Sequence, residues 1–183
     1  TFLGTAGRIN DDDVESNLVK NAEITFLEGY LWDEGEPKKA FDKAIKNSRK
    51  VAMSLSDLFC VERHKSQFLE LVKNRLDIIF ANEQEILSLI STIKFEEVIS
   101  FCKQLNKNII ITRGEKGSIA IKGKNIFECA AKKNLKIRDL TGAGDLFAAG
   151  YLHGIVNNLS VEESLNFGTE LSSKIIQKIG GRI

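Results

Sequence analysis

Short apolar runs alternate with longer amphipathic segments along this 183-residue chain. The apolar runs suit buried strands, and they lie at residues 24–27, 51–55, 77–81 and 108–112. The segments between them, such as the one that starts near Pro37, place apolar side chains on one helical face. Strands that alternate with helices of this length form βαβ units. The sequence therefore predicts a doubly wound α/β fold, with a mostly parallel sheet and helices on both faces.

The strands come closer together in the last third of the chain. A turn at residues 113–117 precedes one further β-rich run, and a turn at residues 123–125 separates that run from a second one. This spacing predicts an antiparallel hairpin after the parallel units. Two helices, at residues 143–156 and about 161–179, are expected to follow.

The composition excludes several classes of protein. With 26 Lys+Arg and 25 Asp+Glu, the net charge of +1 argues against a nucleic-acid-binding protein or a polybasic membrane-surface protein. No apolar run is long enough to span a bilayer. The three cysteines are widely spaced and form no metal-binding motif, so we expect free thiols, one domain and a cytoplasmic location.

The most informative segment is a glycine-rich turn that precedes an apolar helix. Gly142, Ala143 and Gly144 permit a tight turn, and the amides from Gly142 to Asp145 would point outward from a helix N-terminus, which is a site for anions. Asp145 lies in the first turn, where it could accept a proton or merely favour the helix dipole. A dinucleotide fingerprint would need a glycine in place of Phe147, and a phosphate-binding P-loop would need Gly-Lys-Ser/Thr.

The pattern Asp139-x-Thr141-Gly142-Ala143-Gly144-Asp145-x-Phe147 resembles the C-terminal signature of the PfkB, or ribokinase-like, carbohydrate and nucleoside kinases. Leu140 stands at a position that varies in that family. The resemblance implies a ribokinase-like fold and transfer of the γ-phosphoryl group of ATP to a hydroxyl of a small-molecule sugar or nucleoside. It also implies that Asp145 is the general base and that the amides of Gly142, Ala143, Gly144 and Asp145 form an anion hole.

A second motif concerns Mg²⁺. Asn82 and Glu85 follow an apolar strand and resemble the Asn-x-x-Glu element of the family, which organises Mg²⁺ and the phosphates. The end of a parallel strand is also where α/β folds bind ligands. Without the resemblance, the sequence favours Asn82 as a helix N-cap and Glu85 as its capping partner.

Further residues are assigned to the nucleotide by the resemblance. Thr112, Gly114 and Gly117 match a turn that contacts the nucleotide in the family, although the same residues suit an ordinary hairpin turn. Thr141 is also assigned to the nucleotide, and Asn166 and Gly168 are assigned to it by position alone. Some relatives use a K⁺ ion near the segment that matches residues 139–141, and the sequence leaves this open for the present chain.

The resemblance covers only part of the family's length. Full members begin with a portion that carries a Gly-Gly sugar-contact motif and a small β-sheet lid, and neither is recognisable here. Residues 1–183 are therefore expected to be the C-terminal, ATP- and Mg²⁺-binding part of a single kinase domain, with the N-terminal lid region missing and little activity alone. In relatives the lid is the usual dimer contact, so a homodimer of the full-length protein stays open.

The acceptor is less constrained than the reaction. Residues 27–33 and 54–57 look most like sugar kinases or adenosine kinases. A fructokinase or a 2-keto-3-deoxygluconate kinase is the alternative enzyme. A non-catalytic nucleotide-binding module of the same fold is an alternative of another class, and the failed dinucleotide fingerprint makes an NAD-dependent enzyme remote.

Overall fold

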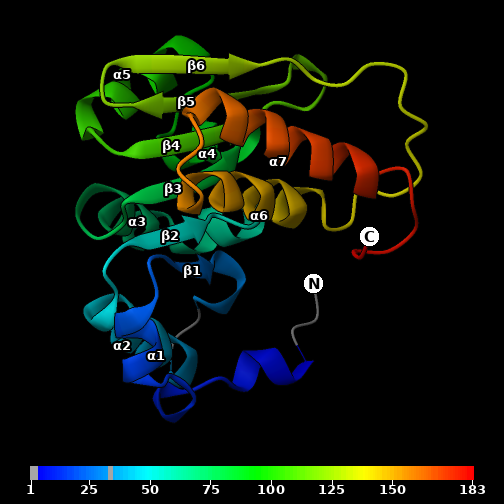
Figure 1. Cartoon of the computed structure of the whole chain (residues 1–183). Coiled ribbons are helices and arrows are strands. Elements are labelled where there is room, and N and C mark those ends of the chain that lie inside the picture. The colour runs from blue at the N-terminus through cyan, green and yellow to red at the C-terminus, as the bar shows by residue number, and fades with distance from the viewer. Residues whose placement is uncertain (1–3, 33–34) are drawn as a thin grey trace.

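The computed structural model describes residues 4–32 and 35–183, and it centres on a mixed sheet of six strands (Figure 1). The strands lie in the order of the sequence, and the first four pair in parallel while the last two pair antiparallel. Their bounds are β1 Thr25–Glu28, β2 Val51–Ser54, β3 Ile78–Asn82, β4 Asn108–Thr112, β5 Ser118–Lys122 and β6 Asn125–Cys129.

Helices connect the parallel strands and then close the chain. The α-helices are α1 Ser16–Asn21, α2 Glu36–Asn47, α3 Leu58–Asn74, α4 Glu83–Leu89, α5 Phe95–Leu105, α6 Ala143–Val156 and α7 Val161–Ile175. Short 3₁₀ turns occur at Gly4–Arg8, Asp11–Asp13, Gly29–Leu31 and Gly114–Lys116. None of these described helices is long and apolar enough to cross a membrane.

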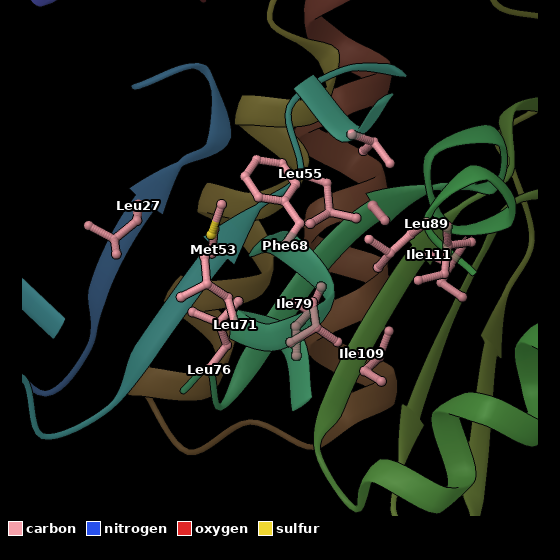
Figure 2. Packing of buried hydrophobic residues seen from close by; sticks show 14 of the residues in the cluster. Leu27, Met53, Leu55, Phe68, Leu71, Leu76, Ile79, Leu89, Ile109 and Ile111 are labelled. Atoms are coloured by element: carbon pink, nitrogen blue, oxygen red, sulfur yellow. The ribbon is translucent and has the colours of Figure 1, made fainter. Parts of the chain in front are cut away.

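The two faces of the sheet carry separate hydrophobic clusters, because successive strand side chains point to opposite faces. On one face, side chains such as Met53, Ile79 and Ile109 pack against α2, α3, α4 and α5, and Figure 2 shows this packing around Phe68. On the other face, Phe80 and other strand residues pack against α6 and α7. The strands are therefore buried on both sides, which explains their continuous apolar runs.

The direction of the chain explains which helix lies on which face. From β1 to β4, each connection leads to the neighbouring strand, always toward the same edge of the sheet. Because such crossovers are right-handed, their helices all lie on one face of the sheet. Within the described residues the strand order does not reverse. The opposite face is covered by α6 and α7, which follow the hairpin of β5 and β6 (Figure 1).

The predicted α/β fold, with parallel strands, helices on both faces and a C-terminal antiparallel hairpin, is confirmed. The last helix ends at Ile175, four residues before the predicted end at 179. The sequence analysis did not predict α1, and this helix has no buried residue, so its sequence lacks the apolar period that marks a packed helix. Cys102 and Cys129 are buried free thiols, and burial raises the pKa of Cys102 to about 12.

Candidate active site

A cavity of about 580 Å³ lies at the carboxyl ends of the parallel strands. Ligands bind at this end of the sheet in α/β folds. Its walls come from the ends of β1 to β4 and from the glycine-rich turn before α6. The lining residues are Glu28, Tyr30, Ser54, Ser56, Phe80, Ala81, Asn82, Glu85, Thr112, Leu140, Thr141, Gly142, Ala143, Gly144, Asp145 and Phe147.

The glycine-rich turn presents three backbone amides at the start of α6. Gly142 is the N-cap and adopts a left-handed φ of 77°, which favours glycine. The amide of Ala143 donates to the Leu140 carbonyl at 3.1 Å, so in this structure it faces away from the predicted anion hole. In the described part of the chain the amides of Gly142, Gly144 and Asp145 have no acceptor, as expected for the first turn of a helix.

Asp139 ties this turn to the end of the chain. Its Oδ1 atom accepts a hydrogen bond from the Thr141 amide at 2.9 Å, and its Oδ2 atom accepts one from the Gly180 amide at 2.8 Å. These bonds, that from Gly180 first, lower the pKa of Asp139. A Cβ atom added at Gly142 would lie 3.0 Å from the Cα of Gly181. Asp139 therefore shapes the turn rather than facing the cavity.

Besides Glu85, two acidic residues from distant parts of the sequence line the cavity. Asp145 is an exposed residue in the first turn of α6, and Glu28 ends β1. The pKa of Glu28 is raised, mainly by burial and further by the negative charge of Asp145, while a hydrogen bond from Ser56 opposes the shift. The Ser56 hydroxyl lies 3.3 Å from Glu28 Oε2 and accepts from the Tyr30 amide at 3.2 Å.

Our sequence reasoning did not assign Glu28 to the site. The available signal was its place at the end of a parallel strand, directly before a glycine. Part of the segment 27–33, which resembled sugar and adenosine kinases, lies outside the described residues, because the structure describes nothing at 33 and 34.

Asn82 and Glu85 form a capping box at the start of α4 and also line the cavity. Glu85 Oε2 accepts from the Asn82 amide at 2.9 Å, Glu85 Oε1 accepts from Asn82 Nδ2 at 2.6 Å, and Asn82 Oδ1 accepts from the Glu85 amide at 2.8 Å. Glu85 is only 4% exposed, and burial raises its pKa to about 7, with Asp57 adding to the rise. The capping interpretation is therefore realised in the structure, and it holds both side chains at the cavity wall.

This donor set fits Mg²⁺ better than a metal that needs several protein ligands. Across residues 4–32 and 35–183 there is no group of three or more His, Cys, Asp or Glu that could hold a metal ion. Mg²⁺ keeps several waters and binds through one or two carboxylates together with substrate phosphates. Glu85 and Asn82 offer oxygen atoms of the required kind beside the three open amides.

The predicted nucleotide turn is only partly in the cavity. Thr112 lines it, but Gly114 and Gly117 do not. Gly117 has a φ of 89°, and a Cβ atom there would lie 2.1 Å from the Cys129 carbonyl oxygen. The glycine is therefore required by the fold of the hairpin, whatever the turn contacts.

Asn166 and Gly168 lie on α7, outside this cavity. A Cβ atom at Gly168 would lie 2.7 Å from the Phe147 carbonyl oxygen, so the glycine permits α6 and α7 to cross closely. The Asn166 side chain donates to the Glu162 carbonyl at 3.0 Å and accepts from the Cys129 thiol at 3.2 Å. The structure thus gives both residues a role in packing.

Comparison with known proteins agrees with the fold and with the resemblance to the PfkB family. The family model described as pfkB family carbohydrate kinase matches residues 1–183. A ribokinase of Lactococcus lactis is 33% identical over 185 residues, which cover 94% of this chain and 60% of the relative. The chain thus spans less than two thirds of the length of that relative.

Solved structures give the same result. The crystal structure of an adenosine kinase from Sinorhizobium meliloti superposes with a TM-score of 0.93 at 37% identity, covering 97% of this chain and 56% of that one. An E. coli structure in complex with ATP and Mg²⁺ has a TM-score of 0.84 at 17% identity, covering 96% of this chain and 59% of that one, and it supports the fold alone. The match over the whole chain and the shared ribokinase-like architecture lead to one conclusion: this chain belongs to the pfkB family of carbohydrate kinases.

Proposed function

We propose that the protein transfers the γ-phosphoryl group of ATP to a hydroxyl of a sugar or nucleoside. One observation carries the proposal: Asp145, three open amides of a helix N-terminus and the Asn82–Glu85 element line a single cavity. Each of these groups has a separate part in phosphoryl transfer, which depends on positioning and on charge stabilisation.

Asp145 is the general base. Its carboxylate is exposed to the cavity, so it can reach the acceptor hydroxyl and take its proton as the bond from oxygen to phosphorus forms. The neighbouring Glu28 lies on the side of the cavity formed by β1.

The amides of Gly142, Gly144 and Asp145 would receive the charge that develops on the transferring phosphoryl oxygens. They need no rearrangement, because the start of α6 already leaves them without acceptors. Asn82 and Glu85 would hold Mg²⁺, which supplies charge neutralisation at the phosphates when it is bound.

The proposal extends to the organisation of the protein. Residues 1–183 would form the ATP- and Mg²⁺-binding part of one kinase domain, with most acceptor contacts supplied by chain beyond this segment. The chain covers 60% of the Lactococcus lactis ribokinase and 56% of the Sinorhizobium meliloti adenosine kinase, which supports this division. Two buried, unpaired thiols agree with a reducing, cytoplasmic location.

The proposed base is tested with Asp145→Asn in the full-length protein. ADP release is measured with Mg²⁺-ATP against adenosine, ribose, fructose and 2-keto-3-deoxygluconate. We expect one acceptor to support turnover, and the variant to lose about a thousandfold in kcat while its affinity for ATP changes little. Glu162→Gln is the matched control, because Glu162 is a first-turn carboxylate of α7 outside the cavity. Normal turnover by Asp145→Asn would refute the assignment of the base.

A further inference from the structure

The ends of β3 and β4 lie side by side, and each carries a predicted site residue. Asn82 pairs with Thr112 in the parallel register. Beyond these residues the chain diverges, into α4 on one side and into the turn before β5 on the other. Three charged side chains bridge this divergence, Glu83, Arg113 and Lys116, and none of them lines the cavity.

The bridge is a partly buried cluster rather than a solvated ion pair. Glu83 Oε2 accepts a hydrogen bond from Arg113 Nε at 3.0 Å, and Glu83 Oε1 lies 3.1 Å from Lys116 Nζ. The side chains of Glu83 and Arg113 are each 21% exposed. The guanidinium carbon of Arg113 lies 3.8 Å from the centroid of the Phe95 ring, so the cation is held on its other side by an aromatic face.

The cluster pairs one carboxylate with two cations. One oxygen atom of Glu83 accepts from Arg113 and the other lies within hydrogen-bond distance of Lys116, and the Glu83 side chain is only 21% exposed. By contrast, the Lys39–Glu36 pair on α2 has side chains that are 61% and 55% exposed. Pairs as exposed as that one contribute little.

The turn itself does not need the cluster for its shape. The Arg113 amide donates to the Gly117 carbonyl at 2.8 Å, and the Lys116 amide donates to the Arg113 carbonyl at 3.1 Å. These backbone bonds fix the turn internally. What the side-chain cluster adds is the position of the turn relative to the start of α4, where Glu83 directly follows Asn82.

We infer that Glu83 and Arg113 are positioning residues that hold the Asn82–Glu85 element and the Thr112–Gly117 turn at a fixed separation. This inference rests on the proposed function, because that separation matters only if one Mg²⁺-nucleotide contacts both. Lys116, which is 63% exposed, neutralises the second oxygen of Glu83. The cluster acts through Asn82, Glu85 and Thr112 and does not itself touch the nucleotide.

The test measures nucleotide affinity of the full-length protein by calorimetry, with Mg²⁺-ATP and with ATP in EDTA. Glu83→Gln and Arg113→Gln are each expected to weaken Mg²⁺-ATP binding about tenfold, because each removes a charge-assisted hydrogen bond. The double variant should lose no more than either single variant. The loss should be smaller for metal-free ATP, because the displaced Asn82–Glu85 element is then not used.

Two further variants separate positioning from stability. Arg113→Lys keeps the positive charge but not the planar group over Phe95, and it should recover part of the affinity without changing the fold. Glu36→Gln breaks the exposed pair on α2 and should leave both affinities unchanged. Thermal melting of every variant checks that it is folded.

The outcomes distinguish the two claims. If wild type binds Mg²⁺-ATP and both single variants bind it equally well, the positioning role is overturned and the proposed function stands. The same conclusion follows if the losses of affinity in the two variants are additive and are the same with and without Mg²⁺. If wild type binds no Mg²⁺-ATP, the proposed function is overturned and the positioning role falls with it.

Discussion

Replacing Glu85 by glutamine should remove a pH dependence of stability that comes from the cavity wall. Burial raises the pKa of Glu85 from 4.5 to about 7. Between these two values the folded chain binds more protons than the unfolded chain, so the free energy of unfolding falls as the pH rises. At about 1.4 kcal/mol per pH unit, this interval corresponds to about 3 kcal/mol of stability that is present at pH 4.5 and lost above pH 7.

Glutamine resembles the protonated acid and does not ionise. Relative to wild type, Glu85→Gln should therefore gain about 3 kcal/mol between pH 4.5 and pH 8. The assay is urea denaturation followed by circular dichroism at several pH values, with the unfolding free energy extrapolated to water. A difference between the two proteins that stays constant over this range would refute the argument from burial.

Glu83, two residues earlier in α4, provides an internal comparison. Its pKa is lowered, so its contribution is present above its unfolded pKa of 4.5 and is lost as the pH falls through the folded value. Glu83→Gln should therefore cost stability at neutral pH and cost less in acid, opposite in sign to Glu85→Gln. If the unfolding free energy of both variants, relative to wild type, changed with pH in the same direction, a group elsewhere in the chain would dominate the pH dependence.

Two other perturbations test features of the site and its support. Gly168→Ala adds a methyl group 2.7 Å from the Phe147 carbonyl oxygen and should lower the unfolding free energy by about 1–3 kcal/mol. An unchanged midpoint of urea denaturation would contradict the packing role of Gly168. Asp139→Ala removes the acceptor of two backbone amides, so the end of the chain should become more sensitive to proteolysis and the affinity for ATP should fall. Wild-type resistance to proteolysis together with wild-type affinity for ATP would contradict the tethering role of Asp139.

The fold was largely predictable because its strands are buried on both faces. Continuous apolar runs, such as the one within Ile78–Asn82, separate cleanly from the amphipathic helices, so the alternation is visible without any tertiary information. The exposed helix α1 carries no such pattern and was not predicted.

The candidate site was predictable only where a local motif contains it. The turn before α6 and the Asn82–Glu85 pair are continuous in sequence, and both line the cavity. Glu28 joins them only through the pairing of β1 with the sheet, which no local pattern specifies. The bond that turns the Ala143 amide away, and the helix crossing that requires Gly168, are likewise consequences of three-dimensional packing.

The position of β1 at the border of the sheet has a practical consequence. Only one side of this strand is paired in the described chain, with β2, so its other side presents backbone donors and acceptors to any extended segment that approaches. The strand contains no proline, and only one of its four residues, Glu28, is charged, so its sequence does little to prevent pairing with another extended segment. Concentrated solutions of this polypeptide are therefore expected to self-associate through that border, and a lysine substituted for Thr25 should improve its solubility.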